Sequence, residues 1–158
     1  MRAALSLVWV MPGQRGENGF EGGDSEKEGN GHPAPSTVLV VEDEVLVRMA
    51  VADHLRHRGY RVLEAKTGEE AQAILRAGEL VEILFCDIDL GSGINGVELA
   101  RWTRENFRDI RILLTSGVWR SAQVADVGDG PLVAKPYSYD FLTAQIGKLL
   151  GAMGRRGG

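Results

Sequence analysis

Short apolar stretches alternate with longer amphipathic ones along most of the chain, and this alternation predicts its secondary structure. Residues 38–41 are apolar and mostly β-branched, which is typical of a strand covered on both faces. Thr67 and Glu70 have the spacing of a capping box, and Ser138 is a favourable N-cap. From such signals we expect strands at 38–41, 61–65, 82–86, 110–114 and 132–134, and helices at 44–58, 67–76, 97–106 and 138–150, with a short, weak helix in the stretch 119–130.

The order of these elements predicts a class of fold. Strands and helices alternate, which is the pattern of an α/β fold with a parallel sheet, helices on both of its faces and right-handed crossovers. In such folds ligands bind beyond the carboxyl ends of the strands, near the point where the strand order reverses. The residues that follow the strands are therefore the first candidates for chemistry.

The two ends of the chain differ in composition from this α/β region. Residues 13–36 are rich in Gly, Glu, Asp, Asn and Pro, with Phe20 almost the only apolar residue, so they cannot bury enough surface to offset the entropy lost on ordering. Residues 151–158 are glycine-rich. We therefore expect a flexible N-terminal extension at 1–36, one folded domain at 37–150 and a C-terminal tail at 151–158.

The apolar run within residues 1–11 is too short to cross a bilayer, which takes about 20 apolar residues. It also lacks the small-residue cleavage pattern of a signal peptide, and Pro12 and Gly13 interrupt it. A disordered tail, an added short element and an upstream start codon remain alternative interpretations. We expect no association with a membrane.

The net charge and the cysteine content bear on nucleic-acid binding and on the cellular compartment. The formal net charge is -4 and the pI is near 5.4, so there is no basic surface for a nucleic-acid backbone, and we expect no direct nucleic-acid binding. The single cysteine, Cys86, cannot form an internal disulfide and fits a reducing compartment. We therefore expect a cytoplasmic protein in which Cys86 packs within its strand.

Polar residues follow four of the five expected strands. Glu42 and Asp43 come after the first strand, Asp87 after the third, Thr115 after the fourth and Lys135 after the fifth. Three carboxylates close together repel one another unless a cation neutralises them, and oxygen ligands suit Mg²⁺ or Mn²⁺. A carboxylate beside a cation, a hydroxyl and an amine forms a coherent phosphoryl-transfer site, with Asp87 as the nucleophile.

Taken singly, these residues have ordinary structural interpretations. Asp43 and Asp87 could each cap a following helix, Thr115 could do the same, and Lys135 could be a surface lysine. Their joint placement at the ends of expected neighbouring strands favours a functional site. The three histidines lack carboxylate or cysteine neighbours at ligand spacing, so we interpret His32, His54 and His57 as structural or surface residues.

The same residues lie within motifs that resemble the receiver domain of response regulators in two-component signalling. The matching segments cover nearly all of the region 37–150, in order: 38–43, 84–90, 94–99, 113–117 and 135–137. The resemblance implies a doubly wound, flavodoxin-like α/β fold with five parallel strands in the order 2-1-3-4-5. It also implies that the Lys135-Pro136 bond is cis, the form that is least costly before proline.

The resemblance implies a role for each residue of the site. Asp87 is expected to accept a phosphoryl group from a histidine kinase or a phosphotransfer protein. Asp43, Asp87 and the backbone carbonyl of Asp89 are expected to bind Mg²⁺ directly, and Glu42 through water.

Two further residues are expected to contact the phosphoryl group itself. Thr115 is expected to hydrogen-bond it and to couple it to movement of the adjacent loop. Lys135 is expected to form an ion pair with it. Asp89 and Gly117 occupy positions that tune the access of water in the family, and the sequence leaves the lifetime of the phosphoryl group open.

Two positions depart from the family pattern. Gly91 stands where proline is usual, and the following Ser92 and Gly93 predict a loose active-site loop. Leu132 stands where an aromatic switch residue is usual, so rotation of an aromatic ring cannot report phosphorylation here. We expect the weak helix before the last strand to respond by ordering or disordering instead.

The expected function is that of a stand-alone, non-enzymatic response regulator that assists its own phosphorylation and dephosphorylation and signals through a protein partner. A homodimer through the last helices is compatible with the family. Two alternatives stay open: a phosphate sink for a shared kinase, and a receiver-like binding module that accepts no phosphate. A small hydrolase is disfavoured, because the chain has neither a glycine-rich phosphate loop nor a nucleophile elbow.

Overall fold

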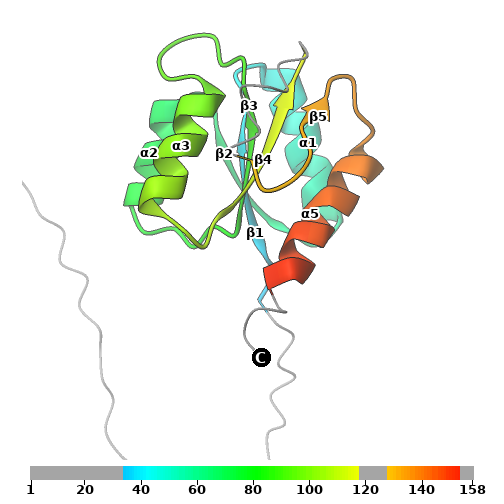
Figure 1. The fold of residues 1–158 in the computed structure, drawn as a ribbon. Helices are drawn as coiled ribbons and strands as arrows, with labels where there is room; N and C mark the ends of the chain where they lie inside the picture. The colour runs from blue at the N-terminus through cyan, green and yellow to red at the C-terminus, as the bar shows by residue number, and fades with distance from the viewer. Residues whose placement is uncertain (1–33, 118–127, 154–158) are drawn as a thin grey trace, which may run out of the picture. The chain divides into compact units, whose positions relative to one another are not determined.

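The computed structural model describes residues 34–117 and 128–153, all within the unit Pro33–Gly158. These residues form a five-stranded parallel sheet with helices on both faces (Figure 1). The elements in chain order are β1 (Thr37–Val41), α1 (Val45–His57), β2 (Arg61–Ala65), α2 (Gly68–Arg76), β3 (Ile83–Asp87), α3 (Gly96–Asn106), β4 (Arg111–Ser116), β5 (Val133–Ala134) and α5 (Tyr139–Met153).

The strand order confirms the predicted topology. The sheet reads β2-β1-β3-β4-β5, so the chain first moves outward from β1 to β2 and then crosses back to β3. The order reverses between β1 and β3, which pair directly along residues 38–41 and 83–86. This is the position at which a doubly wound fold binds its ligand.

Two apolar clusters hold the helices against the sheet. Leu39 and Val41 of β1 face a cluster that includes residues of α2 and α3, whereas Val38 and Val40 face a cluster that includes residues of α1 and α5. Figure 1 shows the same division, with α2 and α3 on one face and α1 and α5 on the other. All four side chains are buried, which at about 1.5–3 kcal/mol each strongly favours the strand. The continuous apolar run in the sequence thus reflects a strand covered on both faces.

Local capping signals fix where several helices begin. Thr67 Oγ1 accepts a hydrogen bond from the Glu70 N–H at 3.2 Å, and Ser138 Oγ accepts one from the Phe141 N–H at 3.1 Å, both at the expected positions. Gly59, which directly follows the expected helix 44–58, has φ of 88°, a left-handed conformation that favours glycine at the end of a helix.

The remaining differences from the expected elements are small. Helix α5 continues to Met153, three residues beyond the expected end at Leu150. β5 contains only two residues, and Leu132, expected within it, is a partly buried residue against the cluster that faces α2 and α3. The expected weak helix at 119–130 falls mostly on residues outside those the structure describes, and residues 128–130 are not helical. Within the described ranges, no helix combines the length and apolar character needed to cross a membrane.

Candidate functional site

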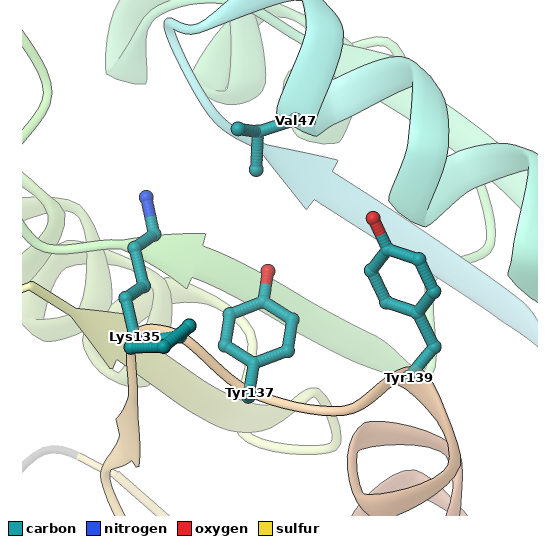
Figure 2. Close-up of a pocket in the computed structure, with 5 residues that line it drawn as sticks. Val47, Lys135, Tyr137 and Tyr139 are labelled. Carbon is teal, nitrogen blue, oxygen red and sulfur yellow. The ribbon is translucent and has the colours of Figure 1, made fainter.

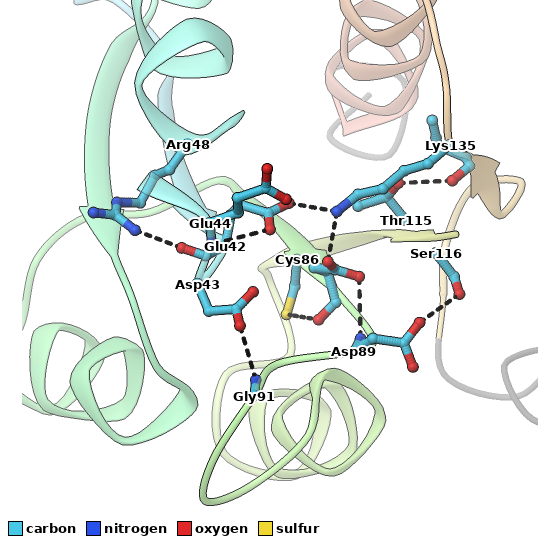
Figure 3. Close-up of polar contacts among 12 residues, drawn as sticks. Glu42, Asp43, Glu44, Arg48, Cys86, Asp89, Gly91, Thr115, Ser116 and Lys135 are labelled. Atoms are coloured by element: carbon cyan, nitrogen blue, oxygen red, sulfur yellow. Dashed lines mark hydrogen bonds and ion pairs between the residues drawn. The ribbon is translucent and has the colours of Figure 1, made fainter. Parts of the chain in front are cut away.

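Four neighbouring strands end at the same edge of the sheet, and each brings a polar side chain to it (Figure 3). Glu42 directly follows β1, Asp87 ends β3, Thr115 lies near the end of β4 and Lys135 directly follows β5. The strand register places Asp87 beside Thr115, and Thr115 beside Val133 of β5. The fold therefore brings the residues proposed from the sequence to one place.

The acidic residues form a cluster suited to a divalent cation. One carboxylate oxygen from each of Glu42, Asp43 and Asp87 lies within 4.8 Å of the others. Glu42 and Asp87 are buried, whereas Asp43 is exposed and leaves one side of the cluster open to water. Oxygen ligands with room for water match the coordination that Mg²⁺ or Mn²⁺ prefers. The side chains present thus fit the metal that the sequence predicts.

Lys135 connects two members of this cluster. Its Nζ lies 2.7 Å from Glu42 Oε2 and 2.6 Å from Asp87 Oδ2. Burial alone would lower the pKa of the amine, but its hydrogen bonds to Asp87 and Glu42 outweigh burial and raise the pKa of Lys135 above its ordinary value. Burial raises the pKa of Glu42, with Lys135 opposing and the charge of Asp87 adding to the shift. The amine is therefore a fixed positive charge beside Asp87.

The Thr115 hydroxyl has a partner away from the carboxylates. Thr115 is fully buried, and its Oγ1 donates a hydrogen bond to the Val133 carbonyl of β5 at 2.8 Å. Its neighbour Ser116 donates from Oγ to Asp89 Oδ2 at 2.9 Å. These contacts link the end of β4 to β5 on one side and to the β3–α3 loop on the other.

The β3–α3 loop is attached to the acidic cluster by two backbone amides. The Asp89 N–H donates to Asp87 Oδ1 at 3.0 Å, and the Gly91 N–H donates to Asp43 Oδ2 at 3.1 Å. The role of the Asp89 carbonyl as a metal ligand stays a prediction. The Lys135-Pro136 bond is cis, as expected.

Four contacts that shape the site have no signal in the sequence. Two are the Ser116–Asp89 and Gly91–Asp43 hydrogen bonds. The other two are made by Arg48, which donates to the Glu42 carbonyl at 2.7 Å and pairs with Glu64 at 3.6 Å. Arg48 lies one turn into α1, at a position where the sequence shows only a charged residue on a helix. Its contact depends on how α1 sits against β1 and β2, which no local signal shows.

Glycine is required close to Asp87. Gly96, the first residue of α3, lies so close to the end of β3 that an added Cβ would overlap the Asp87 backbone carbonyl. Asn95 and Glu98 form a complete capping box around it, because each side chain accepts a hydrogen bond from the other residue's backbone N–H. The sequence Asn95-Gly96-Val97-Glu98 therefore seats α3 directly against the site.

The cysteine and the histidines lie outside this chemistry. Cys86 is fully buried in β3, and burial raises the pKa of its thiol, which agrees with the expected packing role. His54 Nε2 contacts Thr143 Oγ1 of α5 at 3.0 Å, and His57 Nδ1 contacts the Asp53 carbonyl at 2.7 Å. His32 lies outside the described residues.

Comparison with known proteins places this site in a family. The family model described as the response regulator receiver domain matches residues 38–146, which is more than half of the chain, so the chain belongs to this family. The sensor kinase CckA of Brucella abortus is 35% identical over 120 residues, covering 73% of this chain and 12% of the kinase. The aerobic respiration control protein ArcA of Escherichia coli is 31% identical over 118 residues, covering 72% of this chain and 48% of ArcA.

A solved structure of a response regulator that contains Mg²⁺ shares this fold. The response regulator TrrA of Thermotoga maritima, in complex with Mg²⁺-BeF, is 29% identical, with a TM-score of 0.66, and the match covers 72% of this chain and 98% of that one. The chain is therefore a receiver domain of the response regulator type, a family that binds Mg²⁺ at an acidic cluster. The chain spans less than half the length of these two curated relatives.

Proposed function

We propose that this receiver domain accepts a phosphoryl group on Asp87 from a histidine kinase or a phosphotransfer protein, with Mg²⁺ or Mn²⁺ as cofactor, and signals by binding another protein. The observation that carries this proposal is the position of Lys135. Its amine lies between the buried carboxylates of Asp87 and Glu42, with Asp43 completing the acidic cluster. An amine in this place supplies the positive charge that a transferred phosphoryl group needs.

The metal would be held by the carboxylates of Asp43 and Asp87 and the backbone carbonyl of Asp89, with Glu42 contributing through water. When bound, the cation supplies positive charge to the oxygens of the phosphoryl group. These protein oxygens would leave room for water and for a phosphoryl oxygen beside the cation, as Mg²⁺ sites in phosphoryl transfer usually have. The open side of the cluster at Asp43 gives the cation a path to the site from solvent.

In the transfer step, an Asp87 carboxylate oxygen forms a bond to phosphorus while the bond from phosphorus to the donor's histidine nitrogen breaks, and the imidazole leaves. Lys135 then pairs with a phosphoryl oxygen in place of the Asp87 carboxylate. Thr115 has to release the Val133 carbonyl before its hydroxyl can reach the phosphoryl group. Because this release frees an acceptor on β5, phosphorylation alters the contacts of β5 as well as those of the site.

The surface beside Lys135 supports docking of a protein donor. Val47, Pro136, Tyr137 and Tyr139 join Lys135 around a pocket of about 390 Å³ between α1 and the β5–α5 connection (Figure 2). The two helices that contribute to this pocket also carry exposed apolar side chains near their N-termini: Val45, Leu46, Met49, Tyr139 and Phe141. A donor that reaches Asp87 past Lys135 would cover part of this face, and exposed apolar groups of this kind favour association.

Intact mass spectrometry after incubation with acetyl phosphate tests the proposal. We expect the full chain with Mg²⁺ to gain the mass of one phosphoryl group, and we expect Asp87→Asn, or the wild type in EDTA, to gain none. A folded wild-type chain that gains no phosphoryl group would reject the proposal and favour a binding module that accepts no phosphate. Rapid loss of the group, with no partner that distinguishes the phosphorylated form, would instead indicate a phosphate sink.

A further inference from the structure

The β3–α3 loop, residues 88–95, has glycine at position 91 where the family usually has proline, so its conformation depends on other contacts. It carries Asp89, yet Gly91, Ser92 and Gly93 follow within a few residues. Glycine has access to more backbone conformations than any other residue, so this segment has little stiffness of its own. A loop that supplies a metal ligand and also contacts Asp43 would bind a cation weakly if it moved freely, because ordering it would oppose binding.

Two hydrogen bonds to carboxylates outside the loop restrict it. The Gly91 N–H donates to Asp43 Oδ2 at 3.1 Å, and the Ile94 N–H donates to Glu69 Oε1 at 2.9 Å. Asp43 follows β1, and Glu69 lies in the first turn of α2, so the loop is held from two separate elements. Only Ser92 and Gly93 lie between the two restrained amides. The loop is thus more restricted than its composition suggests.

The same glycines that soften the loop make these contacts possible. A Cβ at Gly91 would lie 2.8 Å from Asp43 Oδ2, and a Cβ at Gly93 would overlap the carboxylate of Glu69. Gly93 also has φ of 80°, a conformation that residues with a side chain rarely adopt. A proline at position 91 would remove the donor as well as adding a side chain. Glycine in place of the family's proline at position 91 therefore allows Asp43 to approach the loop, as Gly93 allows Glu69 to do.

Glu69 is suited to this contact although it is exposed. The hydrogen bond from the Ile94 N–H lowers the pKa of Glu69, so the side chain is a carboxylate at neutral pH. A negative charge in the first turn of α2 is also favoured by the helix dipole. The contact is open to water, so its effect on the loop should be moderate rather than decisive.

We propose that Glu69 is a positioning residue for the metal site: it fixes the β3–α3 loop through Ile94, so that the Gly91 N–H keeps Asp43 oriented and the Asp89 backbone stays in place. The inference rests on the proposed function, because the loop that Glu69 positions belongs to the proposed Mg²⁺ site. Groups that orient metal ligands typically change affinity by about 10–100-fold when they are removed. For an exposed contact we expect about threefold to tenfold.

Titration of the ¹⁵N-labelled full chain with Mg²⁺, followed by amide chemical shifts, tests this role without a phosphoryl donor. We expect Glu69→Ala to bind Mg²⁺ about threefold to tenfold more weakly than the wild type. Glu69→Gln keeps an oxygen that accepts from Ile94 and should retain most of the affinity. Glu105→Ala removes the same charge from an exposed position at the far end of α3 and should leave affinity unchanged.

Three more variants separate the effect of each hydrogen bond from the effects of charge and of an added side chain. Glu69→Asp keeps the charge but shortens the side chain, so it should weaken binding as Glu69→Ala does, and it serves if the alanine variant does not fold. Gly91→Ala and Gly91→Pro both add a Cβ near Asp43, but only the proline removes the N–H, so Gly91→Pro should bind Mg²⁺ more weakly than Gly91→Ala.

The outcomes distinguish this inference from the function on which it rests. A wild-type chain that binds no Mg²⁺ would reject the proposed metal site itself. If the wild type binds Mg²⁺ and the folded Glu69→Ala and Glu69→Asp variants bind it as tightly as the wild type does, the role of Glu69 is overturned and the metal site stands.

Discussion

Each residue of the site is placed by the end of a strand rather than by its sequence neighbours. Glu42, Asp87 and Lys135 come from three elements far apart in the chain, and their contacts at 2.6 and 2.7 Å depend on the strand order. Burying the charges of Glu42, Asp87 and Lys135 costs desolvation energy that a buried ion pair commonly does not offset, so the arrangement is better explained by function than by folding. The identity of these residues was predictable from the sequence, because polar residues directly after apolar strands are conspicuous.

At the same scale, some contacts could not have been predicted. The Thr115 hydroxyl donates to the Val133 carbonyl, and Asp89 accepts from Ser116. Both depend on which rotamer a small polar side chain adopts within a buried environment, and sequence patterns contain no such information. The prediction of a loose loop at residues 91–93 did not include the hydrogen bond between the Ile94 N–H and Glu69, because Glu69 lies in another element.

Substitution of Gly96 tests how closely α3 lies against the end of β3. We expect Gly96→Ala to lower the free energy of unfolding by about 1–3 kcal/mol, because the added Cβ overlaps the Asp87 carbonyl. Gly147→Ala in α5 is a matched control: nothing lies within 4 Å of the added Cβ, so it should raise stability by up to about 1 kcal/mol. Urea unfolding measures both. A Gly96→Ala variant as stable as the wild type would contradict this packing.

Among the elements, the starts of helices were predicted more accurately than the end of α5. The Thr67 and Ser138 caps were predicted because a side-chain acceptor three residues before its donor is a local feature. The end of α5 at Met153 was not, since the glycine at position 151 suggested an earlier stop. β5 is short because only Val133 and Ala134 pair with β4, and a run of two residues gives almost no periodicity to detect.

Asp129 fastens the segment before β5 to the sheet. Its N–H donates to the Ile112 carbonyl at 2.7 Å, and its carboxylate accepts from the Ile112 N–H at 2.8 Å. Arg104 and Arg111 form ion pairs with the same carboxylate at 3.4 and 3.6 Å. The carboxylate and the backbone N–H of Asp129 therefore satisfy both backbone groups of Ile112 at a level of β4 that β5 does not reach.

We expect Asp129→Ala to lower the free energy of unfolding by about 1–3 kcal/mol, because it leaves the Ile112 N–H without its acceptor. Hydrogen exchange should become faster at Ile112 in particular. Asp109→Ala removes the same charge from an exposed position and should change neither quantity appreciably. Unchanged exchange at Ile112 in Asp129→Ala would show that another group protects this amide.

For the whole molecule, fold and topology could be predicted from the sequence because the local strand and helix signals agreed with the fold that the motifs imply. Apolar strands alternated with capped helices, and the motif resemblance supplied the strand order that alternation alone leaves open. The face proposed to dock a phosphoryl donor was not predictable. Val45, Leu46 and Met49 look like ordinary positions of an amphipathic helix, and only the structure shows that nothing in the described residues covers them fully.

Variants of this face separate donor docking from chemistry. We expect Leu46→Ser and Met49→Ser to slow phosphoryl transfer from any histidine kinase that phosphorylates this chain, with little effect on phosphorylation by acetyl phosphate. Removing either apolar side chain should slow transfer by severalfold, which corresponds to about 1 kcal/mol. Leu80→Ser is the matched control, since Leu80 is 82% exposed and lies between α2 and β3, away from the site. Equal slowing by Leu80→Ser would contradict this docking face.

The most direct test of the central claim is to locate the phosphoryl group on the chain. Borohydride reduces an aspartyl phosphate to homoserine and leaves an unmodified carboxylate intact, so peptide mass spectrometry of the reduced protein identifies the acceptor residue. After treatment with acetyl phosphate and Mg²⁺, we predict homoserine at position 87 alone, and none when EDTA replaces the metal. Homoserine at Asp43 or Asp89, or equal modification with and without metal, would contradict the assignment of Asp87 as the metal-dependent phosphoacceptor.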